Sequence, residues 1–94
     1  PNFLFAYVNL ANAQFEFKLY DVAINNYKKA LSINKKFIPA YSNLFGAFKK
    51  IRKYNGAVKC CDEIIKIDNE NINAYLDKGD ILMLLKKYKN AIEC

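Results

Sequence analysis

Few residues in this sequence have the types and spacing that covalent or acid–base chemistry needs. There is no histidine, and the three cysteines include the adjacent pair Cys60 and Cys61. The sequence also lacks a CxxC motif and a glycine-rich phosphate loop. Zinc sites, histidine-based catalysis and nucleotide cradles are therefore without their usual parts. We expect no enzymatic activity, no metal site and no cofactor within these residues.

The chemistry that remains is hydrogen bonding and charge. Asn9 and Asn43 lie 34 residues apart, and an asparagine side chain offers both a donor and an acceptor. A column of such residues can hold the amides of an extended peptide without reading its sequence. The net charge of +6 rests on lysine, with Arg52 the only arginine. Because arginine carries most of the bidentate reading of phosphates and base edges, we do not expect nucleic acid to be the main partner.

Composition and cysteine usage indicate an intracellular, cytoplasmic domain. The chain is 53% hydrophobic and 26% charged, as in an ordinary globular protein. Adjacent cysteines rarely pair with each other, so a reduced setting fits best. The most apolar stretch, residues 81–85, ends after five residues at Lys86, far short of the roughly 20 that cross a bilayer. No membrane span and no secretory signal are expected.

The interval of 34 residues runs through the whole chain. It separates the members of four columns, which are Tyr20, Tyr54 and Tyr88; Ala23, Ala57 and Ala91; Ala6, Ala40 and Ala74; and Tyr7, Tyr41 and Tyr75. A fixed period of about 20 to 50 residues is typical of a solenoid built from one supersecondary unit. The chain is therefore expected to hold repeats at about 4–37, 38–71 and 72–94, the last of them truncated.

Apolar residues at spacings of three and four predict helices within each repeat. The expected helices cover about 5–17, 21–34, 39–51, 57–65 and 72–85, and a sixth begins at Tyr88. Pro39 suits the first turn of its helix, whereas Asn55 and Gly56 break the pattern before Ala57. Short connections between such helices predict antiparallel pairs stacked in a row. The expected fold is an all-α superhelix.

These columns resemble the tetratricopeptide repeat, a helix–turn–helix family with the same period. The match rests on Tyr7, Leu10, Ala11, Tyr20, Ala23, Tyr27 and Ala30 in repeat one; Tyr41, Leu44, Phe48, Tyr54 and Ala57 in repeat two; and Tyr75, Gly79, Tyr88 and Ala91 in repeat three. Phe45, Cys61, Ile64 and Lys78 depart from the pattern. The resemblance implies a non-catalytic platform that binds an extended peptide or protein segment in a concave groove.

The resemblance also implies which residues face that groove. The positions that carry over are Phe5, Val8, Asn9, Asn12, Phe15, Glu16, Pro39, Ser42, Asn43, Gly46, Lys49, Lys50, Asn73, Leu76, Asp77, Asp80, Met83 and Leu84. As binding residues we single out Asn9, Asn12, Asn43, Lys50, Asn73, Asp77 and Asp80. The Asn-Leu pairs at Asn9 and Asn43 are similar to the asparagine ladder in the repeat region of O-linked N-acetylglucosamine transferases.

The best-known ligand of the family is the acidic C-terminal tail of heat-shock chaperones, which a clamp of lysine, arginine and asparagine holds. The clamp positions carry over to Val8, Asn12, Asn43, Asn73 and Asp77. Both asparagines are present, but the three cationic positions are lost and one is an acid. We therefore predict no binding of such tails. A peptide with a basic group near Asp77 and Asp80 is the expected ligand.

Other interpretations stay open. The segment could recognise substrates for a larger enzyme, such as a glycosyltransferase, whose catalytic domain lies elsewhere. The cations Lys49, Lys50, Arg52 and Lys53 could form a basic edge that contacts nucleic acid, although cations favour helix C-termini for dipole reasons alone. Self-association through apolar residues of the truncated third repeat, such as Leu82, is also expected.

Overall fold

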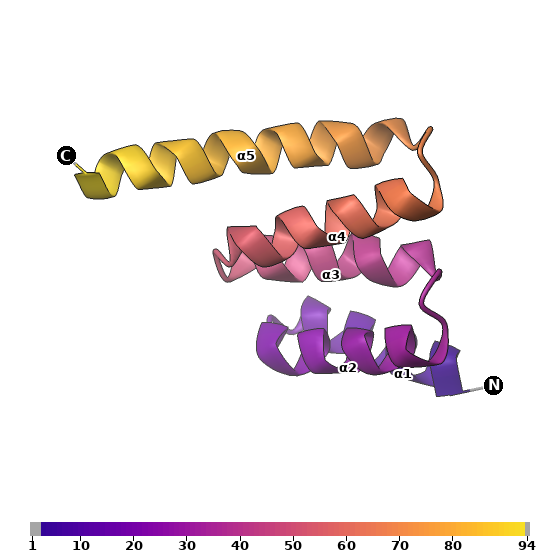
Figure 1. Cartoon of the computed structure of the whole chain (residues 1–94). Coiled ribbons are helices and arrows are strands. Elements are labelled where there is room, and N and C mark those ends of the chain that lie inside the picture. The colour runs from indigo at the N-terminus through magenta and orange to yellow at the C-terminus, as the bar shows by residue number, and fades with distance from the viewer. Residues whose placement is uncertain (1–2, 94) are drawn as a thin grey trace.

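The computed structural model describes residues 3–93, without the side chains of residue 88 and residues 90–93. Its helices are α1 (Phe3–Glu16), α2 (Tyr20–Ile33), α3 (Ile38–Lys50), α4 (Tyr54–Ile67) and α5 (Ile72–Glu93). Helices α1 and α2 form one antiparallel hairpin and α3 and α4 a second, and α5 packs against α4 (Figure 1). The predicted all-α fold of stacked helix pairs is confirmed.

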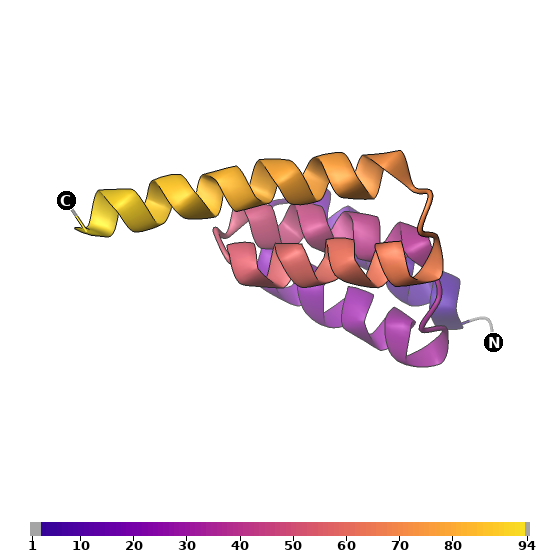
Figure 2. The ribbon, with the colours of Figure 1, turned by 45° about the horizontal axis from the view of Figure 1, so that its top comes forward.

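The two hairpins stack so that α2 and α4 lie in front of α1 and α3 in the view of Figure 1. The second view shows that α5 runs along the α3–α4 hairpin and then extends beyond its end (Figure 2). Small residues allow the helices to approach closely, since Ala23 and Ala57 are fully buried. The prediction that this alanine column lies in the core is confirmed for these two members, and Ala91 lies outside the described side chains.

The turns within the two hairpins have the same geometry. Lys18 and Arg52, 34 residues apart in the sequence, adopt left-handed backbone angles of φ 65 and φ 61. In the first turn the Leu19 N–H donates to the Gln14 carbonyl and the Lys18 N–H to the Phe15 carbonyl. Such paired bonds end a helix when the next residue is left-handed. Because that conformation costs an L-residue about 1–2 kcal/mol, packing of the second helix on the first has to offset it.

The prediction of a turn and a sixth helix at Tyr88 is wrong. Helix α5 passes without interruption through Lys86, the position equivalent to Lys18 and Arg52, and continues to Glu93. The few residues that follow Lys86 in this sequence cannot bury an apolar face against α5, so nothing offsets the cost of a left-handed residue. Adding helical hydrogen bonds is then the cheaper course.

Two smaller boundaries also differ from expectation. Helix α4 begins at Tyr54 rather than Ala57, so Asn55 and Gly56 belong to its first turn. The Ala57 N–H donates to the Lys53 carbonyl, which closes that turn. Pro39 lies in the first turn of α3, as predicted.

The apolar stripe of α1 is only partly buried, which corrects the sequence analysis. Leu10 is 50% exposed and Phe17 is 79% exposed, whereas Leu44, the equivalent of Leu10 in the next hairpin, is 4% exposed. Helix α2 covers this side of α3, but no described helix covers the same side of α1. Burial along this stripe therefore depends on a preceding helix.

Candidate functional site: a polar pocket between α1 and α3

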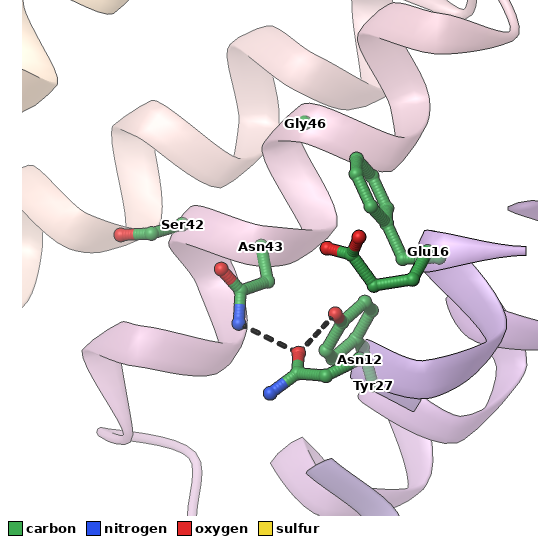
Figure 3. Close-up of a pocket in the computed structure, with 7 residues that line it drawn as sticks. Asn12, Glu16, Tyr27, Ser42, Asn43 and Gly46 are labelled. Atoms are coloured by element: carbon green, nitrogen blue, oxygen red, sulfur yellow. Dashed lines mark hydrogen bonds between the residues drawn. The ribbon is translucent and has the colours of Figure 1, made fainter. Parts of the chain in front are cut away.

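A pocket of about 360 Å³ lies between α1 and α3 (Figure 3). Its lining residues are Asn12, Phe15, Glu16, Tyr27, Ser42, Asn43 and Gly46. All of these except Tyr27 are positions that the sequence analysis assigned to the groove. The structure therefore brings together two of the singled-out binding residues, Asn12 and Asn43.

The two asparagines are joined by a hydrogen-bond network at the pocket wall. The Asn43 side-chain amide donates to the Asn12 carbonyl oxygen over 3.0 Å, and the Tyr27 hydroxyl donates to the same oxygen (Figure 3). Two donors occupy the lone pairs of that oxygen. The Asn12 amide nitrogen and the Asn43 oxygen point away from their shared contact in Figure 3. The pair thus offers one donor and one acceptor, which is the complement of a peptide unit.

Tyr27 holds this network in place from behind. It belongs to α2, its side chain is 1% exposed, and burial, followed by the charge of Glu16, raises the pKa of its hydroxyl. A buried hydroxyl needs a hydrogen-bond partner, and Asn12 supplies it. The sequence analysis missed this role. The signal lay in the column itself, because Tyr27 carries a hydroxyl where Cys61 stands in the next repeat.

The rest of the pocket wall combines an acid with an apolar ring. Glu16 is exposed and is the one charged residue among the lining residues. A Cβ added to Gly46 would lie 3.7 Å from the ring of Phe15, so the glycine leaves room beside that ring. The pocket therefore suits hydrogen-bonding or cationic groups better than carboxylates.

Asn9, Asn73 and Lys50 are exposed, and none of them lines the pocket. The predicted ladder of Asn9 and Asn43 is replaced by the contact of Asn43 with Asn12. The reason is geometric, because Asn12 lies one helical turn beyond Asn9 and there the Tyr27 hydroxyl fixes its amide. As a separate binding residue, Asn9 stays a prediction.

The two predicted acids of α5 have different surroundings. Asp80 lines a second hollow of about 270 Å³ between α3 and α5, together with Lys49, Met83, Leu84 and Lys87. Asp77 is half-buried and close enough to Cys61 of α4 for its charge to help raise the pKa of that thiol, after the larger effect of burial. The structure therefore does not gather Asp77 and Asp80 into one acidic site.

Two more residues have structural roles that the sequence analysis did not assign. Val8, expected in the groove, is 7% exposed and belongs to the core with Leu4 and Ala11, because these three share one helical stripe. Lys78, which departs from the family pattern, contacts Asp62 of α4 over 2.6 Å. The hydrogen bond to Asp62, followed by its charge, raises the pKa of Lys78. This ion pair links α5 to α4.

Within residues 3–93 no cluster of three or more cysteine, aspartate or glutamate side chains is arranged to hold a metal ion. None of the helices in the described part of the chain is both long and apolar enough to cross a membrane.

Comparison with known proteins adds three findings. The family model of the tetratricopeptide repeat matches residues 6–37 and 72–94. No curated protein sequence gives a significant match. Among solved structures, the Arabidopsis OM64 TPR domain superposes with a TM-score of 0.80 at 28% sequence identity, covering 94% of this chain and 73% of that one.

Two further structures share the fold. The first TPR of Spaghetti (RPAP3), bound to the HSP90 peptide SRMEEVD, has a TM-score of 0.80 and 24% identity, covering 88% of this chain and 68% of that one. MamA has a TM-score of 0.84 and 22% identity over 96% of this chain and 53% of that one. Residues 38–71 lie outside the family-model matches, yet α3 and α4 form the same kind of hairpin as α1 and α2.

Proposed function

Since this chain belongs to the tetratricopeptide repeat family, we propose that it is a protein-interaction module that takes up an extended segment of a partner across α1, α3 and α5. The observation that carries this proposal is the Asn12–Asn43 pair, which offers one donor and one acceptor at a pocket. The fold is that of the first TPR of Spaghetti, whose structure contains a peptide.

The pair is suited to a peptide backbone rather than to a particular side chain. Asn12 would donate to a carbonyl oxygen of the bound segment, and Asn43 would accept from an N–H group of that segment. Tyr27 fixes the Asn12 amide before the partner arrives, so less side-chain entropy is lost on binding. Phe15 and the open space at Gly46 leave room for an apolar side chain of the partner.

The charges of this face favour a partner segment with basic or neutral groups. Glu16 lies at the pocket, and a carboxylate placed beside it would be repelled. Asp80 faces Lys49 and Lys87 across the second hollow, so that hollow suits a zwitterionic or neutral stretch. Asn9, Lys50, Asn73 and Asp77 complete the set of residues that we propose to contact the partner.

Peptides selected from a random phage-displayed library against the whole chain test the proposal. Asn12→Ala and Asn43→Ala should each weaken the selected peptides about threefold to tenfold, because each removes one hydrogen bond to the backbone. Asn25→Ala is the matched control, since Asn25 is exposed on α2. Selected peptides that bind all three variants equally well would overturn the proposal.

The charge preference has its own test with the acidic peptide SRMEEVD. We expect isothermal titration calorimetry to detect no binding, because the positions Val8, Asn73 and Asp77 supply no cation. Micromolar affinity would contradict the charge preference, although it would leave the module itself intact.

A further inference from the structure

A second hollow, of about 290 Å³, lies between α2 and α4. Its lining residues are Lys28, Tyr41, Leu44, Phe48, Gly56, Lys59, Cys60 and Glu63. Helix α2 supplies one wall, α4 supplies the other, and α3 supplies the floor. The hollow shares no residue with the pocket between α1 and α3, and it belongs to the layer that lies in front in Figure 1.

The hollow exists because α4 carries small residues where it faces α2. A Cβ added to Gly56 would lie 3.0 to 3.1 Å from atoms of the Phe48 ring, so a glycine is needed for that ring to pack there. Cys60 forms the adjacent wall and is 3% exposed, and Leu44 below it is 4% exposed. Burial raises the pKa of the Cys60 thiol to about 12, so the thiol stays neutral. The interior of the hollow is therefore apolar and uncharged.

The rim of the hollow is positively charged. Lys28 projects from α2 and Lys59 from α4, and neither forms an ion pair among the residues that the structure describes. The Lys28 ammonium group lies 5.7 Å from the centroid of the Phe48 ring, which leaves it at the mouth. Glu63, the acid of the rim, already pairs with Lys66 over 3.4 Å. Two cations on opposite walls thus remain uncompensated.

We propose that this hollow is a second binding site, which takes an aromatic side chain flanked by acidic residues of a partner protein. An aromatic ring would fill the apolar floor and pack against Phe48. Acidic neighbours on either side of that ring would reach Lys28 and Lys59. A purely acidic segment would leave the floor hydrated, and a purely apolar one would leave both lysines unpaired. The site is independent of the groove proposed above.

Amide chemical-shift mapping of the ¹⁵N-labelled chain tests this site with the capped peptide Gly-Asp-Phe-Asp-Gly. The expected shifts cluster at Gly56, Cys60 and Lys59 and leave Asn43 unchanged. Replacing the phenylalanine of the peptide by serine, or both aspartates by lysine, should abolish them. The site is refuted by absence of binding, by equal binding of all three peptides, or by shifts centred on Asn43.

Charge reversal separates the site from general attraction to a basic protein. Lys28→Glu/Lys59→Glu should weaken the peptide about tenfold, since two rim contacts turn repulsive. Lys36→Glu/Lys86→Glu is the matched control, because both lysines are exposed and neither lines the hollow. Equal weakening by the two double variants would show a non-specific effect of net charge and would overturn the proposal.

Discussion

Helices α1 and α3 occupy equivalent positions in successive hairpins, yet they bury their shared apolar column to different extents. Ala40, Leu44 and Ala47 are 0%, 4% and 0% exposed, whereas Leu10 and Phe17 on α1 are 50% and 79% exposed. Helix α2 lies against α3, and no described helix lies against the same side of α1. The period therefore sets which type of residue recurs, but the preceding helix decides whether that residue stabilises the fold.

The largest effect should separate Leu44 from Leu10. Leu44→Ala should lower the free energy of unfolding by about 2–5 kcal/mol, because it leaves a cavity in the core. Leu10→Ala should change it by less than about 1 kcal/mol, since half of that side chain already meets water. Urea denaturation measures both. Equal losses would show that α1 is covered as well as α3.

Overpacking should sharpen the same contrast. Ala40 is fully buried between α2 and α3, so Ala40→Leu should destabilise the chain by about 1–3 kcal/mol. Ala6 is its exposed equivalent on α1, and Ala6→Leu should be close to neutral. If thermal melts show the two variants to be equally stable, the alanine column does not set the approach of the helices.

Raising the pH should test burial at the junction of the two hairpins. Burial raises the pKa of Cys60 from its ordinary value of 9.0 to about 12. The native state therefore keeps a proton that the unfolded chain loses, so stability is intact below pH 9 and falls from there to about pH 12. One such thiol contributes at most about 1.4 kcal/mol per pH unit. Cys60→Ala should reduce this slope in denaturation curves; an unchanged slope would contradict the burial of the thiol.

The smallest effect concerns the polar contact between α1, α2 and α3. Tyr27→Phe removes a donor to Asn12 and should cost about 0.5–1.5 kcal/mol. Tyr7→Phe is the control, because the Tyr7 ring contacts Lys29 and its hydroxyl donates no hydrogen bond in the described part of the chain. Denaturation should rank Tyr27→Phe below Tyr7→Phe, and the reverse order would remove Tyr27 from the network.

Much of the architecture could be predicted because the period constrains it strongly. Tyr20 and Ala23 recur with their turn, and the turn residues Lys18 and Arg52 share one backbone conformation. The straight course of α5 could not be predicted, because it depends on a balance of about 1–2 kcal/mol between a left-handed residue and continued helix. No residue pattern near Lys86 records that balance.

The candidate site was predictable as a face but not as a set of contacts. Asn12 and Asn43 were assigned to the groove from their repeat positions. Their contact depends on the offset between α1 and α3 and on the Tyr27 hydroxyl from a third helix. The hollow between α2 and α4 depends on Gly56 and Cys60 being small together, which matters only once α2 and α4 lie side by side.

The account's main claim is that a partner segment lies along α1, α3 and α5. Amide chemical-shift mapping of the ¹⁵N-labelled chain with a library-selected peptide measures this directly. We predict that the largest shifts occur at Asn12, Asn43 and Gly46, with smaller ones along α5. Shifts confined to α2 and α4 would contradict the claim.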